Sequence, residues 1–333
     1  MAASNGAPLV VFDFDKTIVD CDSDNWVVDA LGATERFDEL LRQLPWNYAI
    51  DAMMGELHSQ GKTIEDVRAT LRTAPLSPHV VAAIKSAYAL GCELRVLSDA
   101  NAFFIGTILE HHGLAGYFSG TDTNPARVDA AGRLAIRPYH EFHAAAPGHG
   151  CDLPTCPPNM CKVIHRSFVE CVFPVHQLLL QFVTDRPGQL QGKVMERILQ
   201  EEEEAAASAG KKRRRAVVYL GDGRGDYCPS LKLREGDYVM PRTGYPVHDL
   251  LLEASPPGAD VRAWDGFEDL APVLLGIVHA EITRAVAEAD VAAADKDTGG
   301  VVVTAPVAEC RGAAMPMHQD ALLGRPNAVR VPN

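Results

Sequence analysis

The sequence predicts an α/β fold built on a parallel sheet. Short apolar runs rich in β-branched residues, at 9–12, 93–97 and 216–220, have the composition of buried strands. Longer stretches with apolar residues at spacings of three and four lie between them and predict helices. Strands that alternate with helices along a chain form sheets whose faces are covered by those helices.

Polar side chains follow each of the three strands. The segments concerned are 13–17, 98–101 and 221–226. Because open α/β sheets bind ligands at the carboxyl ends of their strands, we expect these segments to meet at one edge of the sheet. The glycines of the third segment allow its backbone to approach a ligand closely. The sequence therefore predicts a binding site at this edge.

The chemistry of these segments suits a metal ion and an anion. Asp13 and Asp15 lie about 7 Å apart at Cα if strand geometry continues, so they can share a hard cation or act as nucleophile and general acid. The Thr17 hydroxyl can donate to an anionic oxygen. Asp222 with Asp226 completes an oxygen-rich site of the kind that Mg²⁺ prefers. The alternative is that all these residues are ordinary turn residues after strands.

The order of these motifs resembles that of the haloacid dehalogenase superfamily of phosphohydrolases. It is most similar to the phosphoethanolamine/phosphocholine phosphatase family, including plant members described as pyrophosphatase or thiamine phosphate phosphatase. The matching stretches lie within residues 8–275 and are 11–20, 22–28, 97–104, 156–162 and 219–229. The resemblance implies a Rossmann-like parallel-sheet core with a helical cap inserted after the first strand. It also implies a Mg²⁺-dependent phosphomonoesterase that acts on phosphocholine or phosphoethanolamine through an aspartyl-phosphate intermediate.

The resemblance implies a role for each acidic motif residue. Asp13 would attack phosphorus, and Asp15 would protonate the leaving group and then activate water. Mg²⁺ would bind Asp13, the backbone carbonyl of Asp15, and Asp222, which offsets the repulsion between an anionic nucleophile and an anionic phosphate. Asp226 is expected to orient the water ligands of the metal rather than to bind it.

The remaining phosphate ligands are Ser98, which would hold a phosphoryl oxygen, and Lys162, which would neutralise charge. The family pattern breaks directly after Lys162. The stretch 163–191 separates it from the helix at 192–199 that follows it in relatives, so Lys193 is an alternative for the same role. Valine codons begin with GT and a glutamine codon can be CAG, so this stretch is interpreted as a translated, retained intron. A catalytically impaired splice product is therefore one alternative to an active enzyme.

Substrate choice is expected to depend on Asp24 and Asp99, which match the family's acidic residues near the amino-alcohol head group. Two carboxylates attract an ammonium group. Trp26, Trp46 and Tyr48 either add a cation–π face or serve as core residues of the cap, and Asp24 has an alternative role as a helix N-cap. Inorganic pyrophosphate, which an acidic pair disfavours, and thiamine monophosphate are the alternative substrates.

The predicted organisation is a core formed by 1–20 and 91–280, a cap at 21–90 and a disordered tail at 285–333. Within the core, 163–191 is a predicted insertion and 201–215 a predicted charged loop. A helix at 103–112 and a hairpin near 129–132 are also expected. The cap is predicted from helical stretches at 24–31, 34–44, 49–60, 63–73 and 78–90.

Composition narrows the class of partner. The chain has 333 residues and a formal net charge of −13, which argues against nucleic acid as a partner. No signal peptide pattern and no uninterrupted run of about 18 apolar residues is found, so we expect a cytoplasmic protein without a membrane partner. The expected partner is a small phosphorylated substrate, and the oligomeric state is left open.

The eight cysteines are expected to be thiols or metal ligands rather than disulfides. Three of them, Cys151, Cys156 and Cys161, lie near His143 and His149. Their C-x4-C-x4-C spacing is not a usual zinc pattern. A thiol cluster is therefore preferred over a structural zinc site.

Overall fold

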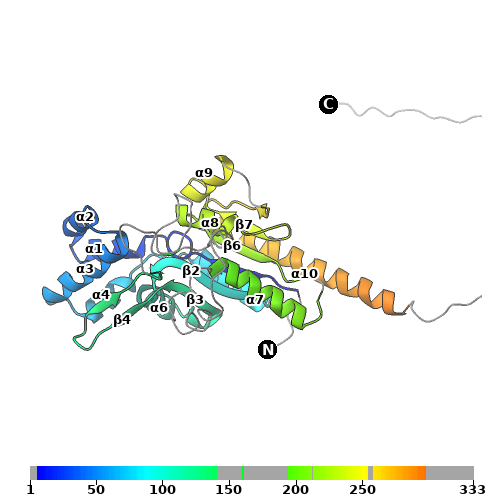
Figure 1. Cartoon of the computed structure of the whole chain (residues 1–333), viewed down its shortest axis with the longest axis horizontal. Coiled ribbons are helices and arrows are strands. Elements are labelled where there is room, and N and C mark those ends of the chain that lie inside the picture. Colours follow the sequence, from blue (N-terminus) through cyan, green and yellow to red (C-terminus); the bar gives the residue numbers. More distant parts are fainter. Residues whose placement is uncertain (1–5, 141–159, 161–193, 212, 254–257, 298–333) are drawn as a thin grey trace, which may run out of the picture. The chain divides into compact units, whose positions relative to one another are not determined.

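The computed structural model describes residues 6–140, 160, 194–211, 213–253 and 258–297 (Figure 1). The chain divides into two units, Met1–Asp290 and Val291–Asn333. Only the first unit is considered below. Cap and core lie together within this unit, so the predicted boundaries at residues 20 and 91 remain a prediction.

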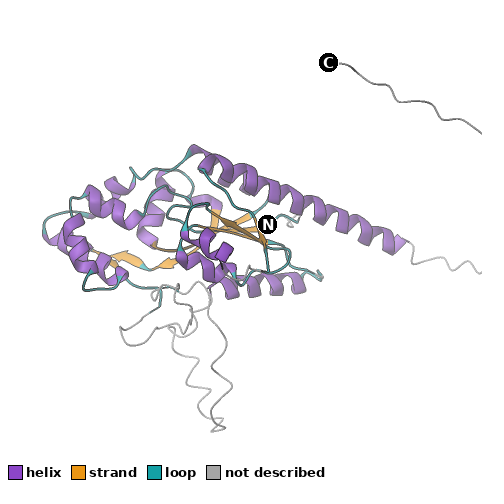
Figure 2. Cartoon of the chain, turned by 90° about the horizontal axis from the view of Figure 1, so that it is seen from above, coloured by secondary structure: helices purple, strands orange, loops and turns teal. Residues whose placement is uncertain are grey.

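A parallel sheet forms the centre of the unit, with helices on both of its faces (Figure 2). It has six strands, in the order β3-β2-β1-β6-β7-β8. Phe12 of β1 pairs with Val96 of β2 on one side and with Leu220 of β6 on the other. The three predicted strands are thus adjacent and in register, which confirms the expected α/β fold. The strand bounds are β1 Leu9–Phe12, β2 Glu93–Asn101, β3 Phe118–Asn124, β6 Val217–Gly221, β7 Tyr238–Pro241 and β8 Asp260–Val261.

Both faces of the central strands are buried, because alternate residues enter different apolar clusters. Val10 and Phe12 pack with side chains of α5, α6 and α10, whereas Leu9 and Val11 pack with those of α7 and α9. A strand covered on both faces reads as a continuous apolar run, as β1 does. The helices concerned are α5 Pro78–Ala89, α6 Ala102–His111, α7 Val194–Ser208, α9 Pro246–Glu253 and α10 Phe267–Asp297.

The predicted helices between β1 and β2 are all present. Their N-termini have local signals: Asp22 accepts from the backbone of Asn25 at 2.9 Å, and Thr63 forms a capping box with Asp66. The N-cap of the first helix is therefore Asp22 and not Asp24. The fifth of these helices, α5, contacts β2. The other four are α1 Ser23–Ala30, α2 Thr34–Leu41, α3 Trp46–Ser59 and α4 Ile64–Leu71.

The predicted hairpin is formed by the antiparallel strands β4 (Ala126–Val128) and β5 (Leu134–Ile136). It packs on α3 through Asp51, which forms a 2.9 Å ion pair with Arg133 and accepts from the backbone N–H of Ile136 at 2.9 Å. This segment beyond β3 is thereby fixed to the helices inserted after β1.

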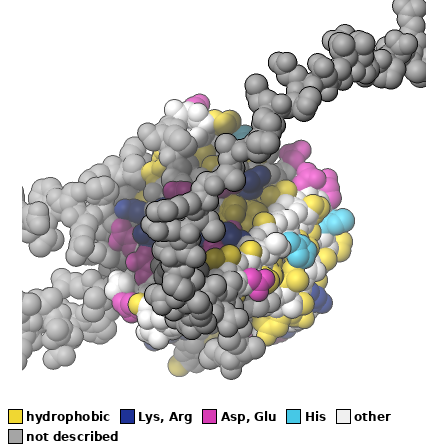
Figure 3. Space-filling model, turned by 90° about the vertical axis from the view of Figure 1, so that its right-hand side faces the viewer, with side chains coloured by type: hydrophobic (Ala, Val, Ile, Leu, Met, Phe, Trp, Pro, Cys, Tyr) yellow, Lys and Arg dark blue, Asp and Glu magenta, His cyan; other side chains and the backbone are white. Residues whose placement is uncertain are grey.

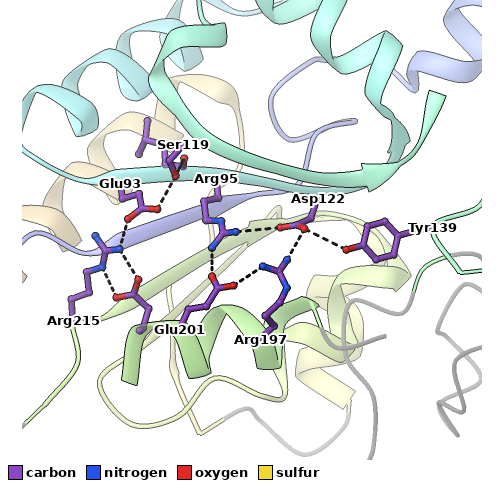
Figure 4. A network of polar contacts seen from close by, with 10 residues as sticks. Glu93, Arg95, Ser119, Asp122, Tyr139, Arg197, Glu201 and Arg215 are labelled. Carbon is purple, nitrogen blue, oxygen red and sulfur yellow. Dashed lines mark hydrogen bonds and ion pairs between the residues drawn. The ribbon is translucent and has the colours of Figure 1, made fainter. Parts of the chain in front are cut away.

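Ion pairs attach α7 to the sheet (Figure 4). Arg197 donates to Asp122 at 2.6 Å, and Arg95 donates to Glu201 at 2.8 Å. The helix continues to Ser208, so the acidic part of the predicted charged loop is helical. The position of α7 is thus set by contacts with β2 and β3.

The basic part of that predicted loop is also engaged with the core. Arg214 forms a two-pronged ion pair with the buried Asp237, at 2.7 and 2.6 Å, and Arg215 pairs with Glu93 and Glu202. Both arginines lie within the range predicted as a charged loop, and both are held by acidic side chains. Their partners lie far along the chain, which the sequence pattern does not reveal.

Within the described residues, one helix has the length and composition to cross a bilayer, at Phe267–Val291. One face of it packs on the sheet through Leu270, Leu274 and Val278, and its buried Glu281 accepts from Tyr238 at 2.8 Å. This face belongs to the core of the unit. On the side of the molecule seen in Figure 3, charged side chains of both signs are interspersed with apolar ones. The helix extends to Asp297, into the range predicted as a disordered tail, whose remainder lies outside the described residues.

Candidate active site

The carboxyl ends of β2, β1 and β6 bring the predicted motifs together, as expected. Asp13 directly follows β1, and its N–H donates to the carbonyl of Leu220 at 2.8 Å, next to the glycine-rich loop after β6. Ser98 is completely buried and lies inside β2, which runs on to Asn101 instead of ending at the motif.

Three buried carboxylates can hold a metal ion. Asp13, Asp222 and Asp226 each offer one oxygen, and these oxygens all lie within 4.8 Å of one another. Their exposed fractions are 4, 9 and 1%, respectively. A compact set of carboxylate oxygens is the environment that Mg²⁺ requires. The predicted ligands were Asp13, the backbone carbonyl of Asp15, and Asp222. The observed set contains Asp226 in addition to Asp13 and Asp222, and the carbonyl of Asp15 remains a predicted ligand.

Asp226 also organises the loop that carries Asp222. Its Oδ1 accepts from the hydroxyl of Tyr219 at 2.5 Å, and its Oδ2 accepts from the N–H groups of Asp222 and Gly223 at 3.0 and 2.9 Å. A Cβ at Gly221 would lie 2.4 Å from Cγ of Asp226, so this position requires glycine. The sequence motifs assign no role to Tyr219, and the one signal for it is a hydroxyl within an otherwise apolar strand.

The segment that carries Asp15 is a turn rather than a continued strand. β1 ends at Phe12, and Lys16 adopts a left-handed φ of 59°. The N–H groups of Ile18 and Val19 then donate to the carbonyl of Phe14 at 2.8 and 3.1 Å. The Cα separation of about 7 Å expected of Asp13 and Asp15 remains a prediction.

The environment of Asp15 favours its protonated form. Burial raises the pKa of this carboxyl well above its usual value, and repulsion by Asp22, Asp24 and Asp13 raises it further. Ser23 donates to Oδ2 at 3.2 Å and partly opposes the rise. A carboxyl whose protonated form is favoured in this way suits the predicted general acid.

Two buried oxygen atoms at the turn have no hydrogen-bond partner among the described residues. They are Oδ1 of Asp15 and Oγ1 of Thr17. Buried polar atoms are normally satisfied, so these two oxygens are candidates for contact with a bound group. A phosphate ester would supply oxygens to both.

A second acidic group consists of Asp24 and the neighbouring carboxylates of Asp22 and Asp99. This carboxylate is 6% exposed and accepts from the indole N–H of Trp46 at 2.7 Å and from the amide of Asn101 at 3.4 Å. Burial, followed by repulsion from Asp22 and Asp99, raises the pKa of Asp24 to about 7. The predicted substrate residues Asp24 and Asp99 are thus electrostatically coupled. Asp22 is a third member that the sequence had not indicated.

The three candidate aromatic residues have different environments. Trp26 is half-buried, and its indole N–H donates to Thr70 and Thr73, so it belongs to the packing between α1 and α4. Trp46 is 40% exposed and packs edge-on against Phe37, with 5.5 Å between ring centroids. Tyr48 is half-buried. Of these aromatic residues, Trp46 contacts Asp24 through its indole N–H.

Lys162, Lys193, the cysteine group and the stretch 163–191 lie outside the described residues. The structure does describe Met160, which precedes the undescribed residues 161–193, and Val194, which follows them. Met160 and Val194 are both completely buried, and both belong to the apolar cluster that contains Leu97 of β2. The chain therefore enters and leaves this stretch from the same part of the core.

Comparison of the sequence with known proteins identifies phosphatases, in agreement with the resemblance inferred from the motifs. The family model described as Putative Phosphatase matches residues 8–171 and 187–278. The chain is 45% identical to "Inorganic pyrophosphatase 2" of Arabidopsis thaliana, over 83% of this chain and 86% of that protein. It is 42% identical to "Thiamine phosphate phosphatase-like protein" of the same plant, over 81% and 95%. Identity to the human "Phosphoethanolamine/phosphocholine phosphatase" is 32%, over 76% and 81%.

The family model covers more than half of the chain, and the plant relatives match most of it at well over 30% identity. The residues between the two matched parts, 172–186, fall inside the predicted insertion. The predicted resemblance to haloacid dehalogenase phosphatases is confirmed. This chain belongs to the Putative Phosphatase family of haloacid dehalogenase-type phosphatases, and it is a phosphatase.

Proposed function

We propose that this phosphatase hydrolyses small phosphate monoesters whose alcohol carries a positive charge, with phosphocholine and phosphoethanolamine as the leading examples. The observation that supports this proposal is the acidic group formed by Asp22, Asp24 and Asp99. It lies close enough to Asp15 for Asp22 and Asp24 to raise the pKa of that residue. Asp24 is buried, Asp22 is half-buried and Asp99 is exposed, and a cation on the leaving group would relieve the repulsion among these three carboxylates.

Trp46 supports the same class of substrate. Its ring is partly exposed, and its N–H donates to Asp24, so an aromatic surface borders the buried carboxylate. Aromatic faces attract quaternary ammonium groups, to a degree that grows as water is excluded. Thiamine monophosphate, with its cationic thiazolium ring, belongs to the same class.

In the proposed reaction, a carboxylate oxygen of Asp13 attacks phosphorus, and the bond to the alcohol oxygen breaks. Asp15 gives its proton to that oxygen and later accepts a proton from the water that hydrolyses the aspartyl-phosphate. Asp13 and Asp222 would hold Mg²⁺, which offsets charge between nucleophile and phosphate when it is bound. Asp226 keeps Asp222 in place through the hydrogen bonds described above.

Inorganic pyrophosphate is a second candidate substrate, because two plant relatives at 45 and 47% identity are named inorganic pyrophosphatases. Its leaving group is anionic, so the group of Asp22, Asp24 and Asp99 would repel it. Hydrolysis of pyrophosphate would then require an additional cation on the substrate.

The decisive experiment compares phosphocholine with 3,3-dimethylbutyl phosphate, which has the same shape but a carbon atom in place of the charged nitrogen. Phosphate release is measured at fixed Mg²⁺, with phosphoethanolamine, thiamine monophosphate and pyrophosphate alongside. We expect kcat/KM for phosphocholine to exceed that of the neutral analogue at least about tenfold, which corresponds to ~1.4 kcal/mol. Equal values would contradict the proposal, faster turnover of pyrophosphate would favour the second candidate, and silence with every substrate would favour an impaired splice product.

A further inference from the structure

Arg242, the first residue after β7, is a buried arginine held largely by aromatic rings. Its side chain is 10% exposed, and its guanidinium carbon lies 4.5 Å from the ring centre of Phe267, 4.6 Å from that of Tyr245 and 5.1 Å from that of Trp264. A planar guanidinium stacks on aromatic faces and keeps its N–H groups free to donate at its edge. The three rings therefore hold the charge while leaving its edge available.

The edge of this guanidinium faces the turn that carries Asp15. Nη1 of Arg242 donates to the carbonyl oxygen of Lys16 at 2.6 Å, and it lies 3.3 Å from Oδ1 of Asp20. Hydrogen bonds from a charged donor are stronger than neutral ones. The short bond to the Lys16 carbonyl is therefore the principal polar contact between Arg242 and the turn.

The Lys16 backbone needs such support. Lys16 is the one non-glycine residue with positive φ in the part of the chain that the structure describes, and this conformation is sterically unfavourable for an L-residue. Its N–H donates to the carbonyl of Cys21 at 3.1 Å, so both of its backbone polar groups are bound. Because Lys16 directly follows Asp15, its backbone conformation constrains the path of the turn that carries Asp15.

The same segment also contacts the metal-binding loop. The N–H of Arg242 donates to the carbonyl of Gly221 at 3.1 Å, and the N–H of Val247 donates to the carbonyl of Asp222 at 3.0 Å. Residues 242–247 therefore touch both acidic loops of the site, one through a side chain and the other through the backbone.

We infer that Arg242 is a positioning residue for phosphoryl transfer: from its aromatic enclosure it fixes the Lys16 carbonyl, and through Lys16 it sets the position of Asp15 relative to Asp13. This inference rests on the proposed function for its catalytic readout. Arg242 does not touch the reacting atoms, so its removal should slow turnover and leave substrate affinity largely unchanged.

The test uses two substitutions in the full chain. Arg242→Ala removes the guanidinium and leaves the aromatic enclosure open, whereas Arg242→Met fills the enclosure without a donor. With phosphocholine we expect kcat to fall roughly 100-fold in both variants, the effect of a misplacement near 1 Å, and KM to change less than about threefold. Ethylguanidinium at millimolar concentration should raise kcat of Arg242→Ala at least about tenfold and leave kcat of Arg242→Met unchanged, because only the first variant has room for it.

Arg262→Ala is the matched control. This arginine pairs with Asp260 and is 55% exposed, so its loss should leave kcat and its response to ethylguanidinium unchanged.

Hydrogen exchange supplies a readout that does not need activity. In Arg242→Ala, a peptide spanning residues 13–20 should exchange faster than in the unsubstituted chain, and ethylguanidinium should reverse the change. If the unsubstituted chain releases no phosphate, the proposed function fails, and this exchange result alone decides the inference. Unchanged kcat in both variants would overturn the inference. It would also be overturned if kcat falls, ethylguanidinium does not restore it, and hydrogen exchange in residues 13–20 is unchanged. If Arg242→Ala does not fold, normal kcat in Arg242→Met is sufficient to overturn it.

Discussion

The hydroxyl group of Tyr219 donates a 2.5 Å hydrogen bond to Oδ1 of Asp226, which joins the centre of β6 to the loop that follows it. The other oxygen of Asp226 accepts from the backbone of Asp222 and Gly223. The metal-binding loop is therefore folded around a carboxylate that a buried tyrosine orients. This arrangement explains why a hydroxyl is present in a strand that is otherwise apolar.

Tyr219→Phe should weaken both the fold and the metal site. A hydrogen bond to a charged group contributes about 1.5–3 kcal/mol, so we expect a fall in Tm of several degrees and a higher Mg²⁺ concentration for half-maximal activity. Tyr238→Phe is the matched control, since Tyr238 donates to the buried Glu281. It should lower Tm without changing the Mg²⁺ requirement. An unchanged Mg²⁺ requirement in Tyr219→Phe would remove this residue from the support of the site.

Asp13→Asn should abolish turnover without unfolding the chain. The substitution keeps the shape of the side chain but removes the attacking charge and one carboxylate of the buried set. We expect phosphate release to fall at least about 1000-fold, and Tm to stay the same or rise because repulsion from Asp222 and Asp226 is relieved. Calorimetry and a phosphate-release assay measure the two effects. Normal activity would sink the proposed mechanism.

Asp24→Asn and Asp99→Asn should change selectivity more than overall rate. Each substitution removes one negative charge from the group that would face a cationic alcohol, so KM for phosphocholine should rise about tenfold or more while KM for pyrophosphate stays constant or falls. Asp66→Asn, at the exposed N-terminus of α4, is the matched control and should alter neither. Equal effects on both substrates would exclude Asp24 and Asp99 from head-group recognition.

Asp24 should also make stability depend on pH. Its pKa is about 7 in the folded chain, raised chiefly by burial, and near 4 when unfolded. Between these values the folded chain binds a proton that the unfolded chain has lost, so its stabilising contribution is fully present below about pH 4 and is lost as the pH rises through about 7. Relative to the unsubstituted chain, Asp24→Asn should therefore gain stability from pH 4 to pH 8. Denaturant unfolding without Mg²⁺ measures this difference, and a difference that stays constant with pH would contradict the assignment.

The stretch 163–191 should be dispensable. Met160 and Val194 lie in the same buried cluster, and the family match omits 172–186. Deletion of 163–191 joins Lys162 to Gly192, so we expect better solubility, a higher Tm and a phosphatase rate at least about tenfold greater, equivalent to ~1.4 kcal/mol. A deletion variant that is less stable and no faster would show that the stretch is an integral part of the fold. An ordinary exon that spans both of its edges would likewise refute its interpretation as a retained intron.

Much of the fold follows from local sequence. The apolar run at 9–12 became the central strand β1, and the helices from 23 to 89 begin at residues such as Asp22 and Thr63, whose side chains cap them. Such signals are contained within a few neighbouring residues, so they can be read without knowing the rest of the structure. The convergence of Asp13, Ser98 and Asp222 also follows, because parallel strands present their carboxyl ends at one edge of a sheet.

By itself, then, the sequence determined the fold class, the polar segments that follow the strands and meet at one edge of the sheet, and the acidic motifs of a phosphatase. Only the tertiary structure decided which residues support those motifs: Tyr219 on Asp226, Arg242 on Lys16, Asp22 beside Asp24, and Asp237 on Arg214. Two of these pairs join residues that are more than 20 positions apart, and all depend on burial. The energy of a buried hydrogen bond or charge is set by neighbours brought together in space, and a local pattern of residues contains no record of them.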